Sequence, residues 1–324
     1  MSVTSGVPQG SVLGPLLFLL FINDMPERFA NSCKLYADDS KIIAIIKKLS
    51  KELDELSLQR DIDKLTDWTK DWLMRLNAIK CKVMYFGGSE ETRKEYTMVD
   101  LTNGSRGPLA ASECERDLGI QIASDLRWSN HVNTIVSKAN RVLGMLLKTF
   151  TSRDKDLWKL LYVSLVRPHL EFASTVWNPY LKGDIEALEK VQRKASKIPS
   201  SMRGLDHEER LKMWGLTTLE ERRTRGDLIQ MYKVRNGLED IGWCTGPQYL
   251  PPPTDDRPLT RDASHNKYRL KREKFSARSC NDFGHQVTVR NEFFLNRVVG
   301  NWNKLASSQI EAQSLNIFKA RIDK

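Results

Sequence analysis

The amino-acid sequence predicts an α+β fold in which a mixed N-terminal part is followed by mostly helical regions. Short apolar runs at residues 82–86 (KVMYF) and 118–122 (LGIQI) are rich in strand-forming side chains and exclude an all-helical first part. From residue 129 onward, apolar side chains recur at helical spacing. Prolines and glycines between residues 242 and 258 indicate a linker. The 324 residues are 40% hydrophobic, which is enough for about two domains with their own cores.

The first part of the chain predicts a loop, a helix and a β-hairpin. Glycines and a proline in residues 5–11 (SGVPQGS) break regular structure, and the apolar run that follows predicts a helix stopped by Pro26. This run is too short to span a bilayer and lacks the features of a signal peptide. We therefore expect a buried core helix and no membrane partner. Residues 33–39 and 41–46 predict the two arms of the hairpin.

Helical periodicity predicts most of the remaining elements. An amphipathic helix is expected at residues 51–76, where Leu58, Ile62 and Leu65 share one face. Asp184 and Asp206 stand where N-caps or first-turn acids stabilise the start of a helix. The other helices are expected at residues 129–150, 154–177, 184–198, 206–214, 219–236 and 291–305.

The charge of the chain favours a polyanionic partner. The formal net charge is +10, from 51 basic and 41 acidic side chains. Residues 1–100 hold 14 basic and 15 acidic residues, so the basic excess belongs to the later part of the chain. Nucleic acid is the simplest partner for such a surface.

The cysteines and histidines indicate no structural metal site. The five cysteines are scattered, odd in number and never in a C-x-x-C pair, which favours a reducing compartment. The five histidines show no metal-binding spacing, and no Ser-His-Asp arrangement or glycine-rich phosphate loop is present. We expect an intracellular protein, in the nucleus, the cytoplasm or both.

Two adjacent carboxylates carry the clearest chemistry. Asp38 and Asp39 lie in a turn between apolar strands, where their charges repel unless cations neutralise them. Hard divalent ions such as Mg²⁺ prefer oxygen ligands and bind one or two protein carboxylates together with substrate phosphates. A pair of such ions stabilises the attacking and leaving oxygens in phosphoryl transfer. The alternative is a simple polar turn, in which the two aspartates have no catalytic role.

A second block precedes this pair. Residues 6–11 (GVPQGS) and 12–18 (VLGPLLF) come before residues 36–39 (YADD). In this order and at this spacing, they resemble blocks of reverse transcriptases, where they form a loop and helix of the palm and its catalytic hairpin. The resemblance implies an incomplete palm of the right-hand polymerase type, followed by mostly α-helical thumb and C-terminal regions.

Further blocks resemble the reverse transcriptases of jockey-like (LINE-type) non-LTR retrotransposons, and together they cover nearly the whole chain. They lie at residues 68–87, 117–120, 165–179, 188–195, 216–223 and 293–303. The resemblance implies a partial palm at residues 1–122, a helical thumb-like region at 123–200, a helical C-terminal region at 201–243, a Pro-rich linker at 244–262, and a basic segment with a terminal helix at 263–324.

The resemblance also implies roles for individual residues. Asp38 and Asp39 would ligate Mg²⁺ or Mn²⁺, and Lys80 would act near the leaving pyrophosphate, unless it is an ordinary solvated lysine. Leu118 and Gly119 would grip the primer end, unless they simply begin a strand. The expected partners are an RNA template, a DNA primer and deoxynucleoside triphosphates. The nucleotide- and template-binding residues would be Gly6, Pro8, Gln9, Gly10, Ser11 and Tyr36.

Two groups of basic residues are candidates for nucleic-acid contact. Near the C-terminus, cations alternate with Tyr268 and Phe275, a pattern that suits phosphate contacts and base stacking. The other group lies on one face of the helix expected at residues 184–198. In both places a solvated charged surface is the alternative. The residues are Lys190, Arg193, Lys194 and Lys197 in the helix, and Lys267, Arg269, Lys271, Arg272 and Lys274 near the C-terminus.

The sequence departs from the family in one respect. Reverse transcriptases use a third carboxylate, on a strand before the GVPQGS block, and only residues 1–5 precede that block here. We expect the fingers and the first catalytic aspartate to be absent, and this chain to polymerise little or not at all by itself. The alternative function is a non-enzymatic, nucleic-acid-binding remnant of a decayed element. The oligomeric state stays open.

Overall fold

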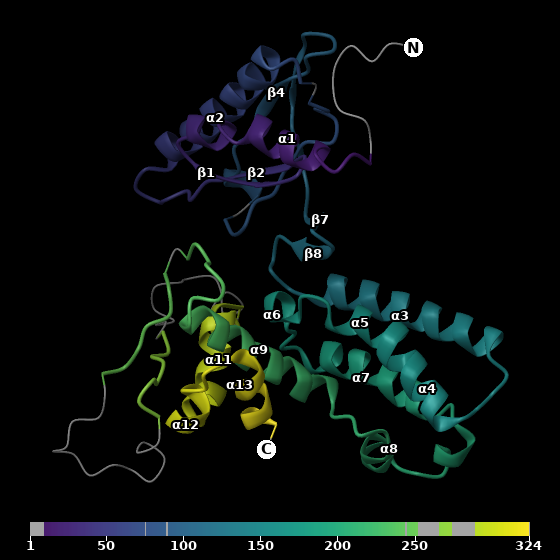
Figure 1. The fold of residues 1–324 in the computed structure, drawn as a ribbon. Helices are drawn as coiled ribbons and strands as arrows, with labels where there is room; N and C mark the ends of the chain where they lie inside the picture. The colour runs from purple at the N-terminus through teal and green to yellow at the C-terminus, as the bar shows by residue number, and fades with distance from the viewer. Residues whose placement is uncertain are drawn as a thin grey trace. The chain divides into compact units, whose positions relative to one another are not determined.

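The computed structural model describes residues 10–74, 76–88, 90–243, 245–251, 266–273 and 289–323. The chain divides into two compact units, Met1–Cys114 and Glu115–Lys324 (Figure 1). Each unit has its own hydrophobic core. No helix in the described ranges has both the length and the apolar character needed to cross a bilayer.

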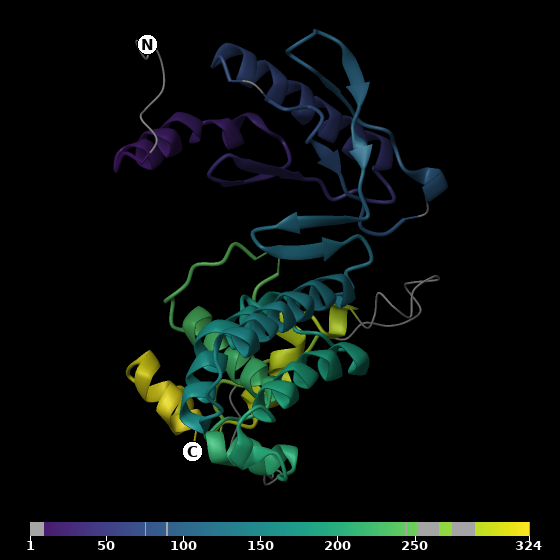
Figure 2. The same ribbon diagram turned by 90° about the vertical axis from the view of Figure 1, so that its right-hand side faces the viewer.

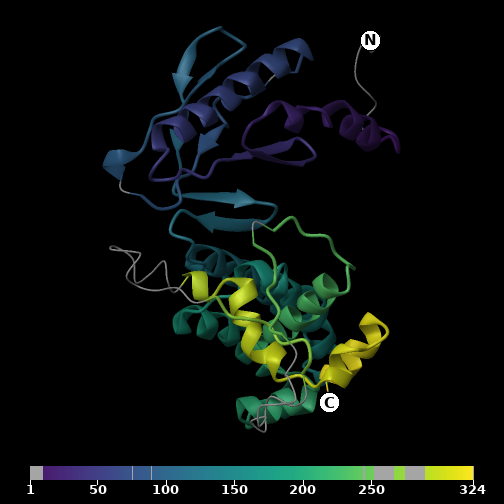
Figure 3. The same ribbon diagram turned by 90° about the vertical axis from the view of Figure 1, so that its left-hand side faces the viewer.

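The first unit combines helices with small two-stranded sheets. Strands β1 and β2 pair antiparallel as the predicted hairpin, which lies beneath helix α2 in the views of Figures 2 and 3. The strand expected at residues 82–86 is shorter, since only Lys82–Val83 pairs, with a parallel partner at Ala110–Ala111. The elements are α1 (Gly14–Ile22), η1 (Met25–Arg28), β1 (Ser32–Tyr36), β2 (Asp39–Ile43), α2 (Lys51–Asp71), β3 (Lys82–Val83), η2 (Glu90–Thr92), β4 (Thr97–Val99), β5 (Arg106–Pro108) and β6 (Ala110–Ala111).

Helix α1 corrects the expectation of a buried core helix. Ile22 is buried, but Leu16 is 53% exposed and Leu20 is 66% exposed. The helix contacts the core of the first unit along one side only, through Phe18, Phe21 and Ile22. Its sequence is apolar on every side, so the hydrophobic pattern could not show which side would lack a neighbour.

A buried carboxylate fixes the start of the β1–β2 hairpin. Asp61 of α2 is completely buried, and its oxygens accept hydrogen bonds from the backbone N–H groups of Ala30 (3.0 Å) and Asn31 (2.8 Å). The side-chain amide of Asn31 also donates to Asp61, at 2.8 Å. These two residues directly precede β1, so Asp61 holds the root of the hairpin against α2.

A second side chain of α2 holds strand β4 in the same way. Gln59 donates from Nε2 to the carbonyl of Thr97 (2.8 Å) and accepts from the N–H of Thr97 (3.0 Å). Together, Asp61 and Gln59 join α2 to two separate sheets through backbone groups.

The second unit is a β-hairpin followed by helices. The helices expected at residues 129–150, 184–198, 206–214 and 219–236 are confirmed to within about two residues at each end. Asp184 lies in the first turn of α7 and Asp206 is the N-cap of α8, as expected. The elements are β7 (Cys114–Asp117), β8 (Ile120–Ala123), α3 (Ser129–Thr149), α4 (Lys155–Leu161), η3 (Tyr162–Val166), α5 (Arg167–Glu171), α6 (Ser174–Trp177), α7 (Lys182–Ser196), η4 (Ser200–Met202), α8 (His207–Trp214), α9 (Leu219–Arg235), α11 (Phe294–Asn303), α12 (Ser307–Ile310) and α13 (Leu315–Ile322).

The single helix expected at residues 154–177 is interrupted. Residues Tyr162–Val166 form a π-helix, in which the N–H of Arg167 donates to the carbonyl of Tyr162, five residues earlier. Pro168 follows at once and has no N–H to continue the α-helical pattern. Ala173, with φ of 53°, then separates α5 from α6. The spacing of apolar residues in the sequence does not reveal where a helix changes its pitch or is interrupted.

Buried polar side chains of α7 join the helices of the second unit. Gln192 is fully buried, accepts from the hydroxyl of Tyr162 (2.7 Å) and donates to the carbonyl of Thr217 (3.1 Å). Glu189 accepts from the N–H of Leu219 at 3.0 Å, at the first turn of α9. These bonds fix the turn between α8 and α9 against α7.

A buried ion pair links the C-terminal helices to the rest of this unit. Arg297 of α11 donates from Nε and Nη2 to both oxygens of Asp227 of α9, each at 2.8 Å, and both side chains are at least nine-tenths buried. Asp227 also accepts from the amide of Asn178, which follows α6. The predicted linker at residues 244–262 lies largely outside the described residues.

Replacing Asp61 with alanine should destabilise the first unit by about 3 kcal/mol. The substitution leaves two backbone N–H groups at the root of the hairpin without acceptors. Urea unfolding measures the loss, and Asp67→Ala, an exposed position on the same helix, is the control. Equal stability of the two variants would show that Asp61 does not anchor the hairpin.

Candidate functional site

The predicted catalytic carboxylates lie at the tip of the β1–β2 hairpin. Tyr36 pairs with Asp39, so Ala37 and Asp38 form a two-residue turn. Cys33 and Leu35 face the core, whereas Tyr36 is 63% exposed. Directly opposed residues share a face of an antiparallel ladder, so Asp39 lies on the outer face with Tyr36.

The turn presents both carboxylates to solvent. Asp38 and Asp39 are exposed, and Ala37 has φ of 52°, a conformation that is costly for a residue with a side chain. A two-residue turn with positive φ at its first position matches the twist of a hairpin. Backbone strain at Ala37 is therefore part of what projects the acidic pair.

The donor set suits a hard divalent cation but is small. Carboxylate oxygens are the ligands that Mg²⁺ and Mn²⁺ accept most readily. Among the described residues, no group of three or more histidine, cysteine, aspartate or glutamate side chains could hold a metal ion. Asp38 and Asp39 thus fit part of a metal site that needs further oxygen ligands.

The structure places the other predicted palm residues around helix and strand ends of the first unit. Lys80 has an exposed side chain, and its N–H donates to the carbonyl of Asn77 (3.0 Å) in the turn before β3. Gly10 is exposed with φ of 83°, which glycine adopts without strain. The hydroxyl of Ser11 accepts from the N–H of Gly14 (3.0 Å) at the start of α1. Gly6, Pro8 and Gln9 lie outside the described residues.

The predicted primer-grip residues form the turn of the β7–β8 hairpin in the second unit. Leu118 and Gly119 have φ of 45° and 92°, as a two-residue hairpin turn requires. Glycine suits the positive φ at position 119, and a Cβ there would lie 3.3 Å from the ring of Phe172, which would have to shift slightly. Leu118 is 47% exposed and Phe172 is 58% exposed. The tip of this hairpin therefore offers apolar surface.

A buried histidine supports this hairpin. His131 of α3 accepts a hydrogen bond at Nδ1 from the N–H of Gln121 in β8 (3.2 Å), and its ring contacts Trp177 edge-on. Its Nε2 is buried with no hydrogen-bond partner in the described structure. Burial lowers the pKa of His131 from 6.5 to about 4, so the ring is neutral at physiological pH.

The basic residues of α7 share one face. Lys190, Lys194 and Lys197 are exposed, and half-buried Arg193 pairs with Glu186 at 2.5 Å. Lys194 reaches Asn140 of the neighbouring helix α3 (3.5 Å). We call Lys190, Arg193, Lys194 and Lys197 the α7 basic face.

The C-terminal basic segment is described only at residues 266–273. Lys267, Lys271 and Arg272 are exposed and Arg269 is half-buried, whereas Lys274 lies outside the described residues. Tyr268 is engaged within the fold, because the guanidinium of Arg235 lies 3.9 Å from its ring and its hydroxyl bonds Glu311. The structure therefore gives the ring of Tyr268 a packing role.

Sequence reasoning missed Asp61 as the anchor of the hairpin. A sequence signal exists, because Asp61 stands next to Ile62 on the side of α2 that packs into the core. An acid at such a position must find hydrogen-bond donors. The sequence does not show that these donors are backbone groups of Ala30 and Asn31.

Stability should fall as the pH drops from 6.5 towards about 4, in part because of His131. The folded protein holds its pKa below the ordinary value, so the unfolded chain takes up the proton first. The loss for this one group is roughly 3 kcal/mol once the pH is below about 4. His131→Asn keeps an acceptor for Gln121 and cannot titrate, so denaturant unfolding across this pH range should show a shallower fall. If the free energy of unfolding falls equally steeply with pH in the wild type and in His131→Asn, His131 is not a source of the loss.

Part of the chain matches a known protein family. Residues 1–144 match the family model described as reverse transcriptase (RNA-dependent DNA polymerase). The RNA-directed DNA polymerase from mobile element jockey of Drosophila melanogaster is 26% identical over 226 residues, covering 65% of this chain and 24% of that protein. Its namesake from Drosophila funebris gives the same identity and the same coverage. The probable RNA-directed DNA polymerase from transposon X-element of Drosophila melanogaster is 22% identical over 206 residues, covering 61% and 22%.

No solved structure matches the chain. The chain spans about a quarter of the length of these curated relatives. The family match includes the β1–β2 hairpin with Asp38 and Asp39, and extends through the β7–β8 hairpin into α3. Residues 1–144 are therefore similar to reverse transcriptases, and the chain is similar to a segment of the RNA-directed DNA polymerases of these Drosophila mobile elements.

Proposed function

We propose that this chain supplies the catalytic hairpin and nucleic-acid-binding helices of an RNA-directed DNA polymerase. The reaction adds deoxynucleotides to the 3′-hydroxyl of a DNA primer on an RNA template. One observation carries the proposal: two exposed carboxylates, Asp38 and Asp39, lie at a strained hairpin tip within the residues that match the family.

The chemistry assigned to this hairpin is metal-dependent phosphoryl transfer. Mg²⁺ or Mn²⁺ bound there would stabilise the charge on the attacking and leaving oxygens. Asp38 and Asp39 provide carboxylate oxygens for the ion. Lys80 supplies a positive charge or a proton for the departing pyrophosphate. Since the described residues offer only part of a ligand set, we expect little or no polymerisation by this chain alone.

The proposed organisation assigns binding roles to the remaining regions. Residues 1–122 act as the palm, in which Gly6, Pro8, Gln9, Gly10 and Ser11 approach the template and the incoming nucleotide. Residues 123–200 act as a thumb-like region. Its α7 basic face contacts phosphates, and the tip at Leu118 and Gly119 contacts the primer end. The basic residues at positions 267–274 add further phosphate contacts.

Primer extension on an RNA template tests the catalytic assignment. Any extension by the purified chain in Mg²⁺ or Mn²⁺ should fall at least about a hundredfold in Asp38→Asn and in Asp39→Asn, because each removes a charged metal ligand. Asp67→Asn, on the exposed side of α2, is the matched control. Extension that persists unchanged in both hairpin variants would place the catalytic site elsewhere.

The α7 basic face should govern the salt dependence of primer–template binding. Replacing Lys190, Lys194 and Lys197 with glutamine should reduce the slope of log affinity against log salt concentration by about 2 to 3, because fewer counterions are released. Fluorescence anisotropy at several salt concentrations measures the slope. Lys212→Gln, an exposed lysine of α8, should change it by less than about 1. An unchanged slope in the triple variant would remove α7 from the interface.

A further inference from the structure

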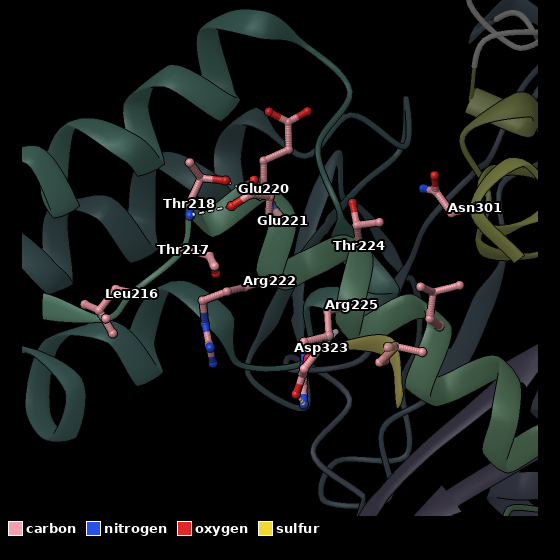
Figure 4. Close-up of a pocket in the computed structure, with 13 residues that line it drawn as sticks. Leu216, Thr217, Thr218, Glu220, Glu221, Arg222, Thr224, Arg225, Asn301 and Asp323 are labelled. Carbon is pink, nitrogen blue, oxygen red and sulfur yellow. Dashed lines mark hydrogen bonds and ion pairs between the residues drawn. The ribbon is translucent and has the colours of Figure 1, made fainter. Parts of the chain in front are cut away.

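A small cavity of about 180 Å³ lies between α9 and the α5–α6 segment of the second unit. Six residues line it: Glu171, Ser174, Arg222, Arg223, Arg225 and Gly226. Arg222 and Arg225 also line a larger cleft of about 870 Å³, so the two cavities adjoin. Figure 4 shows this cleft, with Arg222 and Arg225 on one side of α9 and Asp323 beside Arg225. We call the small cavity the arginine pocket.

Arg223 is a buried cation with one hydrogen-bond donor that has no acceptor in the described structure. Its side chain is almost fully buried, at 2% exposure, and it forms no ion pair with any residue that the structure describes. Nε donates to the amide oxygen of Asn178 (2.9 Å), but Nη1 is buried without a hydrogen-bond partner. Burial lowers the pKa of Arg223, and the opposing charges of Glu220, Glu189, Asp227 and Glu171 offset part of that effect. A buried N–H group without an acceptor is costly, and an anion that accepted a hydrogen bond from it would relieve that cost.

Two further arginines bring unused donors to the pocket. Arg222 binds Glu171 through Nε and Nη2, and Arg225 binds Asp323 through the same two atoms (2.5 and 2.7 Å). Within the described structure, the Nη1 group of each has no hydrogen bond. The single acid of the lining is Glu171. It forms ion pairs with Arg222 and with Arg167, the latter at 3.6 Å. The lining therefore has a positive excess.

The pocket is open because residue 226 is glycine. Gly226 lies in the middle of α9, where glycine costs about 1 kcal/mol relative to alanine. A Cβ at this position would meet no atom within 4 Å, so packing does not explain the glycine. Its missing side chain leaves space beside the three guanidinium groups.

We propose that the arginine pocket binds one phosphate group of a nucleic-acid strand. Guanidinium groups match the geometry of phosphate oxygens, and Ser174 adds a residue with a hydroxyl group to the lining. The adjoining cleft, lined by Thr217, Thr218 and Asn301 among others, has room for the sugar and base attached to that phosphate. The choice of a nucleic-acid strand rests on the proposed function, whereas the phosphate chemistry rests on the pocket alone.

Thermal unfolding of the full chain in sodium phosphate, with ionic strength held constant by chloride, tests the pocket. The midpoint should rise saturably with phosphate for the wild type. Gly226→Ala and Gly226→Leu should weaken phosphate binding in order of size, with at least a tenfold loss for leucine. Arg223→Gln should also lose at least tenfold. Gly144→Leu is the matched control, because Gly144 is a glycine inside α3 with equally open surroundings.

If the thermal unfolding midpoint of the wild type does not respond to phosphate, the proposed phosphate site is wrong. Unchanged phosphate binding in Gly226→Leu would also contradict it. A ten-nucleotide DNA should compete with phosphate in the wild type. If phosphate binds but this DNA does not displace it, free phosphate is the ligand and the strand is excluded. Asp38→Asn should bind phosphate normally, so failure of the catalytic assignment would leave this result intact.

Discussion

Buried carboxylates that accept hydrogen bonds from backbone N–H groups organise both units of this protein. Asp61 binds two such groups directly before β1, and Glu189 binds the N–H of Leu219 at the start of α9. A buried N–H without an acceptor is costly, so each carboxylate fixes the path of a chain segment distant in sequence. The tip that carries Asp38 and Asp39 extends from a root that Asp61 holds in place.

The same kind of contact explains sequence blocks that have no evident catalytic role. The block at residues 188–195 contains Glu189 and Gln192, which bind backbone groups of the block at residues 216–223. The terminal block contributes Arg297, which pairs with Asp227 and so connects to Asn178 in the block at residues 165–179. These blocks are therefore partners in two sets of buried hydrogen bonds, and their residue types follow from the need to satisfy buried hydrogen-bonding groups.

Much of the secondary structure could be predicted from periodicity, because helix α3 and hairpin β1–β2 each satisfy one clear pattern. Prediction failed where contacts between distant segments determine which side of a helix is buried or where a helix is interrupted. Helix α1 is apolar on every side, yet one face lacks a neighbour, and the helix expected at residues 154–177 breaks at a π-helix and Pro168. Asp38 and Asp39 were found from their motif. The arginine pocket was missed because its members come from three helices and a glycine that carries no chemical signal.

We infer that the tip of the β1–β2 hairpin binds the catalytic metal ion. Iron(II) can replace Mg²⁺ at carboxylate sites, and with ascorbate and peroxide it cleaves the backbone close to where it is bound. We predict cleavage within residues 36–41 in the presence of a deoxynucleoside triphosphate, absent in the Asp38→Asn, Asp39→Asn double variant. Mass spectrometry of the fragments locates the cuts. Cleavage confined to other segments, or cleavage at the hairpin that persists in the double variant, would contradict the account.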